Sequence, residues 1–490
     1  MEKNTGSKSV YIGVDIGTGS TRAVAYDEDL NVQAIHYEEI ETQTDQSGQA
    51  VQDPKKILKN VRKCLTKVAK QNAPVKAISF SAMLHSLVGL DDKGEPLTPL
   101  FTWADTRGRE YADRLGDLIG DFHSRTGCVL HPMYPAAKLL WLKEEEPEKF
   151  RSVPLWGSIK SFVFMNLLDR FVEGRGVASA SGLLNTEFDW DGEILSVLHL
   201  SPENLPTTMG AREKIDGDTD IPGLDKASVY PGGGDGMLAH LSTAGLVKDR
   251  ISSTIGTSGA LRVATTEPLL DREGKLWSYD LFPDRWICGG ALNNGGLALD
   301  WFIDNFVNED VREKGEVYAK IDRCVETIRP GSSGLIFAPF LTGERSPGWR
   351  PYMKGGFLGL TISHGRAEMA RAIMEGVTYR LKGIEELLTP YLQDDITIRA
   401  SGGYTRSNSW LQIQADVFDA KIEVPEVEES AARGAALVAM QGEGEIRELP
   451  EPLIGKVIRP EHEKVELYES LYRDQAEYYR FLADYYKKRV

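Results

Sequence analysis

Cysteine is scarce in this 490-residue sequence, and long apolar runs are missing. No two of its four cysteines, Cys64, Cys128, Cys288 and Cys324, form a CxxC pair, so neither a zinc ribbon nor a dithiol redox motif is predicted. Sparse cysteines are typical of a reducing cytoplasm, where we expect the protein to reside. Met1–Val10 is short and polar, and no run approaches the length that crosses a bilayer. We therefore expect neither a signal peptide nor a membrane span.

Basic residues are also fewer than acidic residues. The sequence has 57 Lys and Arg against 73 Asp and Glu, a formal net charge of -16. A chain this acidic is a poor candidate for binding nucleic acid or anionic membranes, so we expect small-molecule partners instead. An anionic nucleotide would have to be held by local donors and a metal ion, because the overall field repels it.

The phosphate-binding loop GxxxxGK[ST] does not occur, which excludes a P-loop as a phosphate site. A different glycine-rich phrase occurs twice instead. Asp15-Ile16-Gly17-Thr18-Gly19-Ser20 near the N-terminus returns, about half a chain later, as Thr254-Ile255-Gly256-Thr257-Ser258-Gly259. A repeat at this offset indicates two similarly built halves rather than a short-period solenoid.

Each copy of the phrase lies between two strand-like runs and is therefore predicted to be the tip of a β-hairpin. Glycine allows close backbone approach, and such a tip is able to direct N–H groups at a phosphate. A single copy would more often be an ordinary glycine-rich turn. Two matched copies favour two tips that face each other across a cleft and hold a nucleoside triphosphate.

The length exceeds one ordinary hydrophobic core, so two large domains are expected. We place the boundary near Gly245–Lys248, which gives domains 1–246 and 247–490. Strands and helices alternate along the chain, which indicates the α/β class. The clearest expected elements are a helix from Pro54 after a capping Asp53, a strand Val75–Met83, helices Pro135–Glu146 and Ser430–Met440, and a long helix capped by Ser363.

An acid stands inside a glycine run at Tyr230-Pro231-Gly232-Gly233-Gly234-Asp235-Gly236. Little side-chain bulk surrounds Asp235, so a substrate and a phosphate can approach it, and its carboxylate could accept the proton of an attacking hydroxyl. Standing alone, it would more often be a turn aspartate. The run also mimics a GxGxxA dinucleotide motif, but no opening βαβ unit precedes it.

A second glycine pair, Gly402-Gly403, follows the expected strand Ile396–Ala400 and precedes a helix through Trp410 and Val417. Backbone without side chains beside a helix N-terminus could cover an adenine or a ribose. A tight strand-to-helix turn explains the pair equally well.

Over nearly its whole length, from Tyr11 to about Met440, the sequence resembles the FGGY carbohydrate kinases, which have the actin/Hsp70/hexokinase fold. Family-like stretches are Met133–Leu142, Gly356–Leu360 and Glu368–Glu375. The resemblance implies two ribonuclease H-like α/β domains that flank an ATP cleft. The first would hold the sugar site and one phosphate hairpin, and the second the other hairpin and the adenosine site.

Within the family the sequence is most similar to the gluconokinases. The stretches that carry this similarity are Ser81–Ser86, Thr102–Arg107, Arg125–Gly127, His131–Met133, Asn293–Gly296 and Gly343–Pro347. Xylulokinases have Gln where Ala82 stands here. Gluconokinases have Ser-Ala-Met-His directly, whereas Leu84 separates Met83 from His85 in this sequence, which leaves the register of His85 open.

The resemblance implies roles for individual residues. Asp235 would be the catalytic base, and Asp15 and Asp235 would hold Mg²⁺. The hairpin residues that would bind the phosphates of ATP are Gly17, Thr18, Gly19, Ser20, Gly256, Thr257 and Ser258, and Gly402 and Gly403 would contact the adenosine. The residues that would line the sugar site are Met83, His85, Trp103, Asp105 and Arg107.

The sugar-site residues also make chemical sense as a set. In an extended segment Trp103, Asp105 and Arg107 would share one face, and Arg107 could bind a carboxylate bidentately. Without the family, Trp103 would be interpreted as a partly buried core residue, and Asp105 and Arg107 as a surface ion pair.

The expected reaction is ATP-dependent phosphorylation of a primary hydroxyl, at C6 of D-gluconate, with domain closure to exclude water. The alternative enzyme is a related kinase that acts on a pentulose, such as a xylulokinase, or on another sugar acid. A nucleotide-dependent binding or assembly protein of the actin/Hsp70 kind is a further alternative, against which the FGGY stretches and the Asp235 loop argue. A homodimer stays open as the assembly state.

Overall fold

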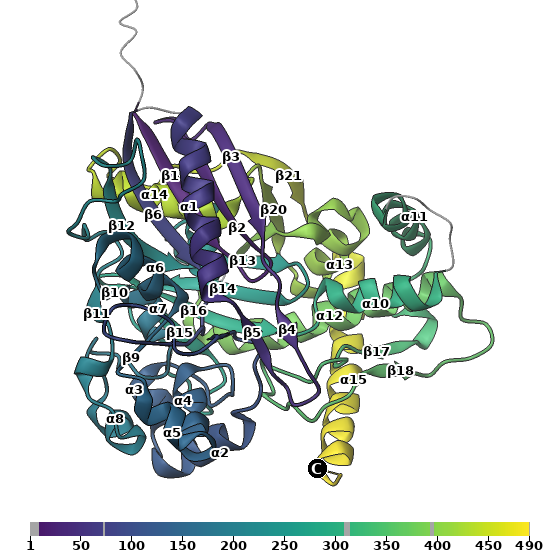
Figure 1. The fold of residues 1–490 in the computed structure, drawn as a ribbon. Coiled ribbons are helices and arrows are strands. Elements are labelled where there is room, and N and C mark those ends of the chain that lie inside the picture. Colours follow the sequence, from purple (N-terminus) through teal and green to yellow (C-terminus); the bar gives the residue numbers. More distant parts are fainter. Residues whose placement is uncertain (1–8, 72–73, 308–313, 393–395, 490) are drawn as a thin grey trace, which may run out of the picture. The chain divides into compact units, whose positions relative to one another are not determined.

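The computed structural model describes residues 9–71, 74–307, 314–392 and 396–489 (Figure 1). Most of the N-terminal stretch for which no signal peptide is expected therefore lies outside the described residues. The chain divides into two compact units. Unit 1 comprises Met1–Leu246, Thr265–Ile287 and Val427–Glu451, and unit 2 comprises Val247–Ala264, Cys288–Glu426 and Pro452–Val490.

Unit 1 is built on a five-stranded mixed sheet in the order β12-β6-β1-β2-β3. Its strands are β1 (Val10–Ile16), β2 (Ser20–Tyr26), β3 (Val32–Glu39), β6 (Val75–Ala82) and β12 (Ser228–Gly234). β1 pairs antiparallel with β2 and parallel with β6, and β6 pairs parallel with β12. The carboxyl ends of β1, β6 and β12 consequently lie at one edge of the sheet, where functional side chains gather in such folds.

Helices cover both faces of this sheet because the strands are apolar on both sides. Ile12, Val14 and Ile16 of β1 pack in one core with the buried stripe of α1 (Pro54–Gln71), whereas Tyr11 packs in another core with the alanines of α14 (Ser430–Gly442). Figure 1 shows α1 and α14 on the two sides of β1 and β2. The contact with α14 is close, since a Cβ atom on Gly13 would lie 1.8 Å from the Ala432 carbonyl oxygen.

Unit 1 also contains short strands and helices outside this five-stranded sheet. Its other strands are β4 (Gln43–Thr44), β5 (Ala50–Gln52), β7 (Val88–Leu90), β8 (Leu100–Phe101), β9 (Leu155–Gly157), β10 (Val172–Gly174), β11 (Thr207–Met209) and β15 (Trp277–Phe282). Its other helices are α2 (Arg109–Leu118), α3 (Phe122–Thr126), α4 (Pro135–Glu145), α5 (Pro147–Ser152), α6 (Ile159–Leu168), α7 (Arg175–Ser179), α8 (Gly192–Leu198), α9 (Asp235–Ala244) and the 3₁₀ turn η1 (Pro202–Asn204).

Unit 2 repeats the sheet of unit 1. Its strands are β13 (Arg250–Ile255), β14 (Gly259–Thr265), β16 (Arg285–Leu292), β19 (Thr397–Ser401), β20 (Lys421–Pro425) and β21 (Ile454–Ile458), in the order β16-β14-β13-β19-β20-β21; the division between units falls within β14 and β16. β13 pairs antiparallel with β14 and parallel with β19, as β1 does with β2 and β6. The two similarly built halves indicated by the sequence repeat are therefore confirmed as two sheets of matching topology.

The helices of unit 2 surround this sheet and a small hairpin. They are α10 (Gly296–Phe306), α11 (Lys314–Glu326), α12 (Arg366–Leu388), α13 (Asn408–Phe418) and α15 (His462–Lys487), with the 3₁₀ turns η2 (Ser332–Gly334), η3 (Thr389–Tyr391) and η4 (Gly403–Arg406) and the hairpin β17 (Ile336–Ala338) and β18 (Gly356–Leu358). The expected cap Ser363 is wrong. α12 begins after Gly365, whose N–H donates to Glu368 Oε2 at 2.9 Å, while the Ser363 hydroxyl bonds to Thr361.

The division differs from a single cut along the chain. The expected point between residues 246 and 247 coincides with one limit of the units, but residues 265–287 and 427–451 also belong to unit 1. The reason for the second segment is the alanine face of α14, which packs against β1 and α9. The division into domains 1–246 and 247–490 stays a prediction.

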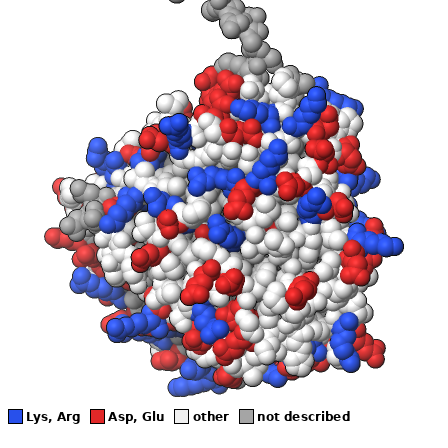
Figure 2. Space-filling view, turned by 90° about the vertical axis from the view of Figure 1, so that its left-hand side faces the viewer, with Lys and Arg blue, Asp and Glu red and all other residues white. Residues whose placement is uncertain are grey.

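Charged side chains are mixed on the surface. Figure 2 shows positive and negative groups interspersed over the face it presents. Among the described residues, no helix is sufficiently long and apolar to span a membrane.

Candidate active site

The first repeated phrase forms the predicted hairpin. β1 and β2 pair in register up to Ile16 and Thr21, and the Gly17 N–H donates to the Ser20 carbonyl oxygen at 3.0 Å to close the tip. A Cβ atom on Gly19 would meet nothing within 4 Å. The tip is thus open on the Gly19 side, as a loop that receives a phosphate must be.

Two carboxylates lie beside this hairpin. Asp15 Oδ1 accepts a hydrogen bond from the Ser81 hydroxyl at 2.8 Å, and Asp235, the first residue of α9, accepts one from the Gly236 N–H at 2.6 Å. Burial and the nearby charge of Asp235 raise the pKa of Asp15 to about 7. The structure therefore brings together the two acids that the sequence had placed in one site, and their mutual repulsion makes the pair attractive to a cation.

Arg22 is a third charged group here, and the sequence reasoning missed it. Its Nε lies 3.9 Å from Asp15 Oδ2, and its two terminal nitrogens donate to Glu429 Oε2 at 2.5 Å and to the Ser20 hydroxyl at 2.6 Å. The signal was present, since the hairpin register places Arg22 directly opposite Asp15. The guanidinium can offset negative charge at the hairpin.

Close packing accounts for two glycines of the run before Asp235, Gly232 and Gly234. The pairing of β12 with β6 shifts between Tyr230 and Gly233, and Gly232 has a φ of 64° with a would-be Cβ atom only 2.2 Å from the Phe80 carbonyl oxygen. A Cβ on Gly234 would lie 2.3 Å from the side chain of Leu84. The run thus carries a bulge that brings Asp235 to the end of the sheet, and the interpretation of Asp235 as a turn residue alone misses its neighbour Asp15.

The segment with Trp103, Asp105 and Arg107 is not extended. Trp103 and Arg107 each begin a turn, so the expected shared face of an extended segment is wrong. Trp103 nevertheless lies at the hairpin, because its Nε1 donates to the Thr18 hydroxyl at 3.1 Å. This bond connects a residue predicted for the sugar site with one predicted for the phosphate site.

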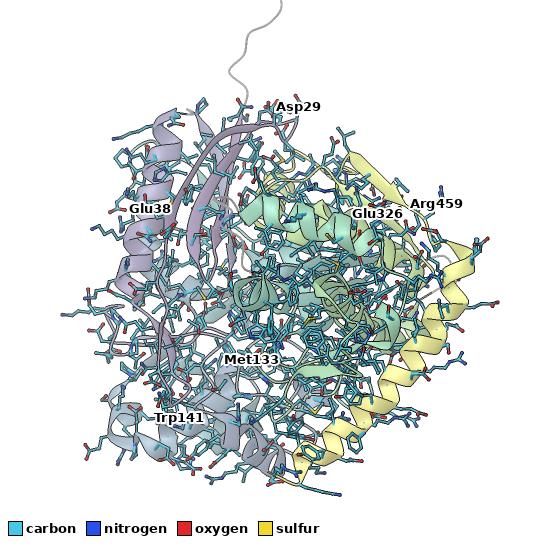
Figure 3. The ribbon with its side chains drawn as sticks, turned by 90° about the vertical axis from the view of Figure 1, so that its right-hand side faces the viewer. Asp29, Glu38, Met133, Trp141, Glu326 and Arg459 are labelled. Carbon is cyan, nitrogen blue, oxygen red and sulfur yellow. The ribbon has the colours of Figure 1, made fainter. Side chains whose placement is uncertain are left out.

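Asp105 and Arg107 form a built pair rather than a loose surface one. Asp105 is buried and accepts from the Ala50 N–H at 3.1 Å and from Arg107 Nη2 at 2.6 Å. The guanidinium of Arg107 lies over the ring of Trp141, which Figure 3 labels, at 4.5 Å from its centroid. Asp105 therefore accepts hydrogen bonds from protein donors and holds Arg107 in place, and its part in the sugar site stays a prediction.

Met83 and His85 follow β6 on the same side of unit 1. Met83 is buried, and its N–H donates to the Ile16 carbonyl oxygen at 2.9 Å. His85 has a φ of 65°, and its Nδ1 lies 2.7 Å from the Ala180 carbonyl oxygen. The additional residue Leu84 is thus accommodated by a turn, which aims the His85 ring toward Tyr134 at 4.8 Å between ring centroids.

Lys138 supports this turn and was not singled out from the sequence. The side chain is fully buried on α4, and its Nζ donates to the carbonyl oxygens of His85, at 3.0 Å, and of Met133. Burial lowers the pKa of Lys138 to about 7. A lone lysine within the apolar stretch Met133–Leu142 was the signal that could have found it.

Unit 2 holds the second hairpin, also as predicted. Its tip is closed by the Gly256 N–H, which donates to the Ser258 carbonyl oxygen at 3.0 Å. Thr254 occupies the place that Asp15 has in the first hairpin, and its hydroxyl lies 3.0 Å from the Ser401 hydroxyl and 3.3 Å from Arg262 Nη1. This hairpin offers hydroxyl and N–H donors where the first one has a carboxylate.

The Gly402-Gly403 pair forms a tight turn at the end of β19. Gly402 has a φ of 96°, and a Cβ atom there would lie 2.5 Å from the Ile255 carbonyl oxygen, so glycine is needed for the fold at this position. A Cβ on Gly403 would meet nothing within 4 Å. The interpretation of Gly402 as part of a tight turn after the strand is therefore confirmed. Contact with adenosine stays a prediction for both glycines.

Most of the chain matches a known protein family. The N-terminal domain of the FGGY family of carbohydrate kinases matches residues 10–242, and its C-terminal domain matches residues 251–442. A gluconokinase of Bacillus subtilis (strain 168) is 34% identical over 456 residues, which cover 89% of this chain and 88% of the relative.

Two solved structures are similar over almost the whole chain. A gluconate kinase from Lactobacillus acidophilus has a TM-score of 0.92 at 29% identity and covers 99% of this chain and 100% of its own. A ligand-bound xylulose kinase from the same organism has a TM-score of 0.92 at 29% identity, with coverages of 98% and 100%. With both domain models matched in order and the hairpins and acids in place, the chain belongs to the FGGY family of carbohydrate kinases.

Proposed function

We propose that this carbohydrate kinase transfers the γ-phosphoryl group of ATP to the C6 hydroxyl of D-gluconate. The observation that carries the proposal is the placement of two carboxylates, Asp15 and Asp235, beside the Gly/Thr/Ser hairpin of unit 1. A phosphoryl transfer needs an acceptor for the hydroxyl proton next to a site for phosphate, and this arrangement supplies both. The 34% identity with a gluconokinase supports gluconate as the acceptor.

In the proposed step the carboxylate of Asp235 accepts the proton of the C6 hydroxyl. The hydroxyl oxygen forms a bond to the γ-phosphorus, the bond from that phosphorus to the bridging oxygen of the β-phosphate breaks, and ADP leaves. N–H groups of the hairpin and the guanidinium of Arg22 would offset charge on the transferred group. Positioning and electrostatic stabilisation supply most of the rate acceleration in such reactions.

The residues present fit a magnesium ion as a companion of ATP. Among the described residues, no group of three or more His, Cys, Asp or Glu side chains is arranged to hold a metal. Mg²⁺ needs no such group, because it is commonly held by one or two carboxylates together with substrate phosphates. Asp15 and Asp235 would be these carboxylates, and the ion when bound would offset negative charge on the phosphates.

The acceptor side is proposed to include Trp103 and Arg107. Arg107 gives Nε and one Nη2 donor to Asp105, and Nη1 reaches the Gln49 side-chain oxygen at 3.4 Å. An arginine has five N–H donors, so these bonds leave two for a carboxylate. A fixed, partly exposed guanidinium suits the acid group of gluconate better than it suits a neutral ketose.

Product analysis tests this proposal directly. The protein is incubated with ATP, Mg²⁺ and D-gluconate, and ³¹P NMR should show one new phosphate monoester coupled to the C6 protons for each ADP formed. A phosphate on another carbon, or ADP without a sugar phosphate, would contradict it. D-xylulose is the second candidate acceptor because a xylulose kinase is structurally as similar as the gluconate kinase. The cytoplasmic location of the protein and its assembly as a homodimer stay predictions.

A further inference from the structure

A buried ion pair lies beside the glycine run of unit 1 and has no part in the step described above. Lys160 is the second residue of α6 and Glu173 lies on β10, and both side chains are almost fully buried. Lys160 Nζ is 3.8 Å from Glu173 Oε1. A buried ion pair often adds little stability compared with apolar residues of similar size. Stability alone therefore does not explain why Lys160 and Glu173 are paired here.

The ammonium group of Lys160 reaches the run that leads to Asp235. Its Nζ donates to the carbonyl oxygen of Gly233 at 3.3 Å. β10 packs against α6 and β12, which Figure 1 shows side by side. Gly233 is the residue at which pairing with β6 resumes after the bulge, and only Gly234 separates it from Asp235. The lysine therefore binds the backbone at the point where the strand recovers its register.

Glu173 in turn holds Lys160 within a closed network. Its Oε1 accepts from the Gly174 N–H at 2.9 Å, and its Oε2 accepts from the hydroxyl of Ser158. The same hydroxyl accepts from the Lys160 N–H at 2.9 Å and so caps α6. The first turn of the helix and the carboxylate fix both ends of the lysine side chain.

Glycine at position 174 allows this approach. A Cβ atom there would lie 3.1 Å from the Gly232 carbonyl oxygen and 3.2 Å from Lys160 Nζ. Burial lowers the pKa of Lys160 to about 8, against the opposing charge of Glu173, and raises the pKa of Glu173. Burial thus disfavours the charged forms of both side chains, which lie beside the backbone that leads to Asp235.

We propose that Lys160, held by Glu173, is a positioning residue that sets the place of the Asp235 carboxylate through the Gly233 carbonyl group. The inference rests on the proposed role of Asp235 as the proton acceptor. Loss of the lysine would let the bulged backbone relax, and a displacement of the base by a fraction of an ångström to an ångström lowers turnover without weakening substrate binding.

The test compares Lys160→Met, the double variant Lys160→Met/Glu173→Leu and Glu173→Gln by steady-state kinetics and thermal unfolding. The double variant removes both charges, so no unpaired ion stays buried. We expect kcat to fall at least tenfold in both variants that lack the lysine and several-fold in Glu173→Gln, with the KM for ATP and for the acceptor within about twofold. Lys143→Met is the matched control, because Lys143 also donates to a backbone carbonyl, that of Val197 at 2.6 Å, and should leave kcat unchanged.

A double variant that regains both stability and kcat would show a structural role only and overturn the proposal. Where the Lys160 variants do not fold, Glu173→Gln decides, because it keeps the volume of the side chain, and an unchanged kcat in it would also overturn the proposal. Failure of the proposed function would be recognised by different results. If the protein prefers another acceptor, the Lys160 variants are assayed with that acceptor. If Asp235→Asn keeps full activity, Asp235 is not the proton acceptor, independently of the result for Lys160.

Discussion

The two hairpins of this kinase have the same strand pairing but differ in the length of the tip and in their chemistry. In unit 1, Asp15 lies opposite Ser81 of the parallel neighbour and near Arg22 of the antiparallel one. In unit 2, Thr254 has the same two kinds of neighbour, Ser401 and Arg262. The constellation of acid or hydroxyl, serine and arginine is thus preserved in both copies.

One exchange, carboxylate for hydroxyl, separates the two copies of this constellation. A carboxylate repels phosphate unless a cation or a proton lies between them, whereas a hydroxyl donates to phosphate directly. A second acid, Asp235, raises the pKa of Asp15 further. Under the proposed function, the duplicated scaffold would place the proton and metal chemistry in one copy and anion binding in the other.

The largest expected effect on kcat comes from removing the carboxylate of Asp235. Asp235→Asn should lower kcat by about two to four orders of magnitude, since a positioned base contributes that much, while ATP still binds. Steady-state rates and calorimetric titration with ATP measure the two quantities. Asp92→Asn, a change in an exposed turn, is the control. Near-normal turnover of Asp235→Asn would reduce Asp235 to a turn residue.

Exchanging the distinguishing residues tests the comparison itself. Asp15→Thr makes the first hairpin like the second and should lower kcat by about a hundredfold, because a preorganised charged group is lost. Thr254→Asp makes the second hairpin like the first and should instead weaken ATP binding by about tenfold, since a carboxylate would face phosphate. Fluorescence titration and initial rates separate these outcomes. If Thr254→Asp binds ATP normally, the second hairpin does not contact phosphate.

A smaller effect is expected from crowding the tips. A Cβ atom on Gly256 would meet no atom within 4 Å, so Gly256→Val should fold normally and act only on a ligand. We expect it to weaken ATP binding about tenfold and to leave acceptor binding intact, and Gly17→Val to do the same. Calorimetric titration is the measurement, and an unchanged ATP affinity in both variants would contradict the prediction that both hairpins serve one nucleotide.

The smallest effect concerns Asp280, another acid of unit 1 with a raised pKa. Asp280 is buried, neither of its oxygens has a hydrogen-bond partner among the described residues, and burial raises its pKa to about 7 despite Arg175 at 3.7 Å. The folded protein then binds more protons than the unfolded chain between about pH 4 and 7, so ionisation of Asp280 destabilises the fold increasingly across this range and fully above it.

Asp280→Asn removes that titration while keeping the shape of the side chain. The Tm difference between this variant and the unmodified protein should therefore shift in favour of the variant by a few degrees from pH 5 to pH 8. Thermal unfolding at the two pH values measures it. A Tm difference that is independent of pH would show that Asp280 titrates as an ordinary aspartate.

Local patterns predicted those parts of the fold that depend on neighbours in the sequence. Asp53 and Pro54 begin α1 as expected, with the Lys55 N–H donating to Asp53 Oδ1 at 2.9 Å. An aromatic stripe at helical spacing most often packs in a core, and Tyr468 and Tyr479 of α15 are indeed buried. Both hairpins also follow from short phrases flanked by apolar runs.

What the sequence did not yield depends on contacts between distant segments. The packing of Ala432 on Gly13 assigns α14 to unit 1, and no local pattern announces it. Asp105 accepts a hydrogen bond from the backbone of Ala50, which lies 55 residues away and which no local pattern indicates. Lys160 of α6 reaches Gly233 of β12 because both elements pack against β10, and no local pattern predicts this packing.

The acceptor preference tests the central claim most directly. Initial rates of ADP formation are measured with D-gluconate, D-xylulose, D-ribulose and glycerol under the same conditions. We expect kcat/KM for gluconate to exceed that for each neutral acceptor by at least tenfold, because a carboxylate bound by an arginine contributes about 1.5–3 kcal/mol. Equal or faster turnover of a neutral ketose would contradict the gluconate assignment and leave the chain as an FGGY kinase of another sugar.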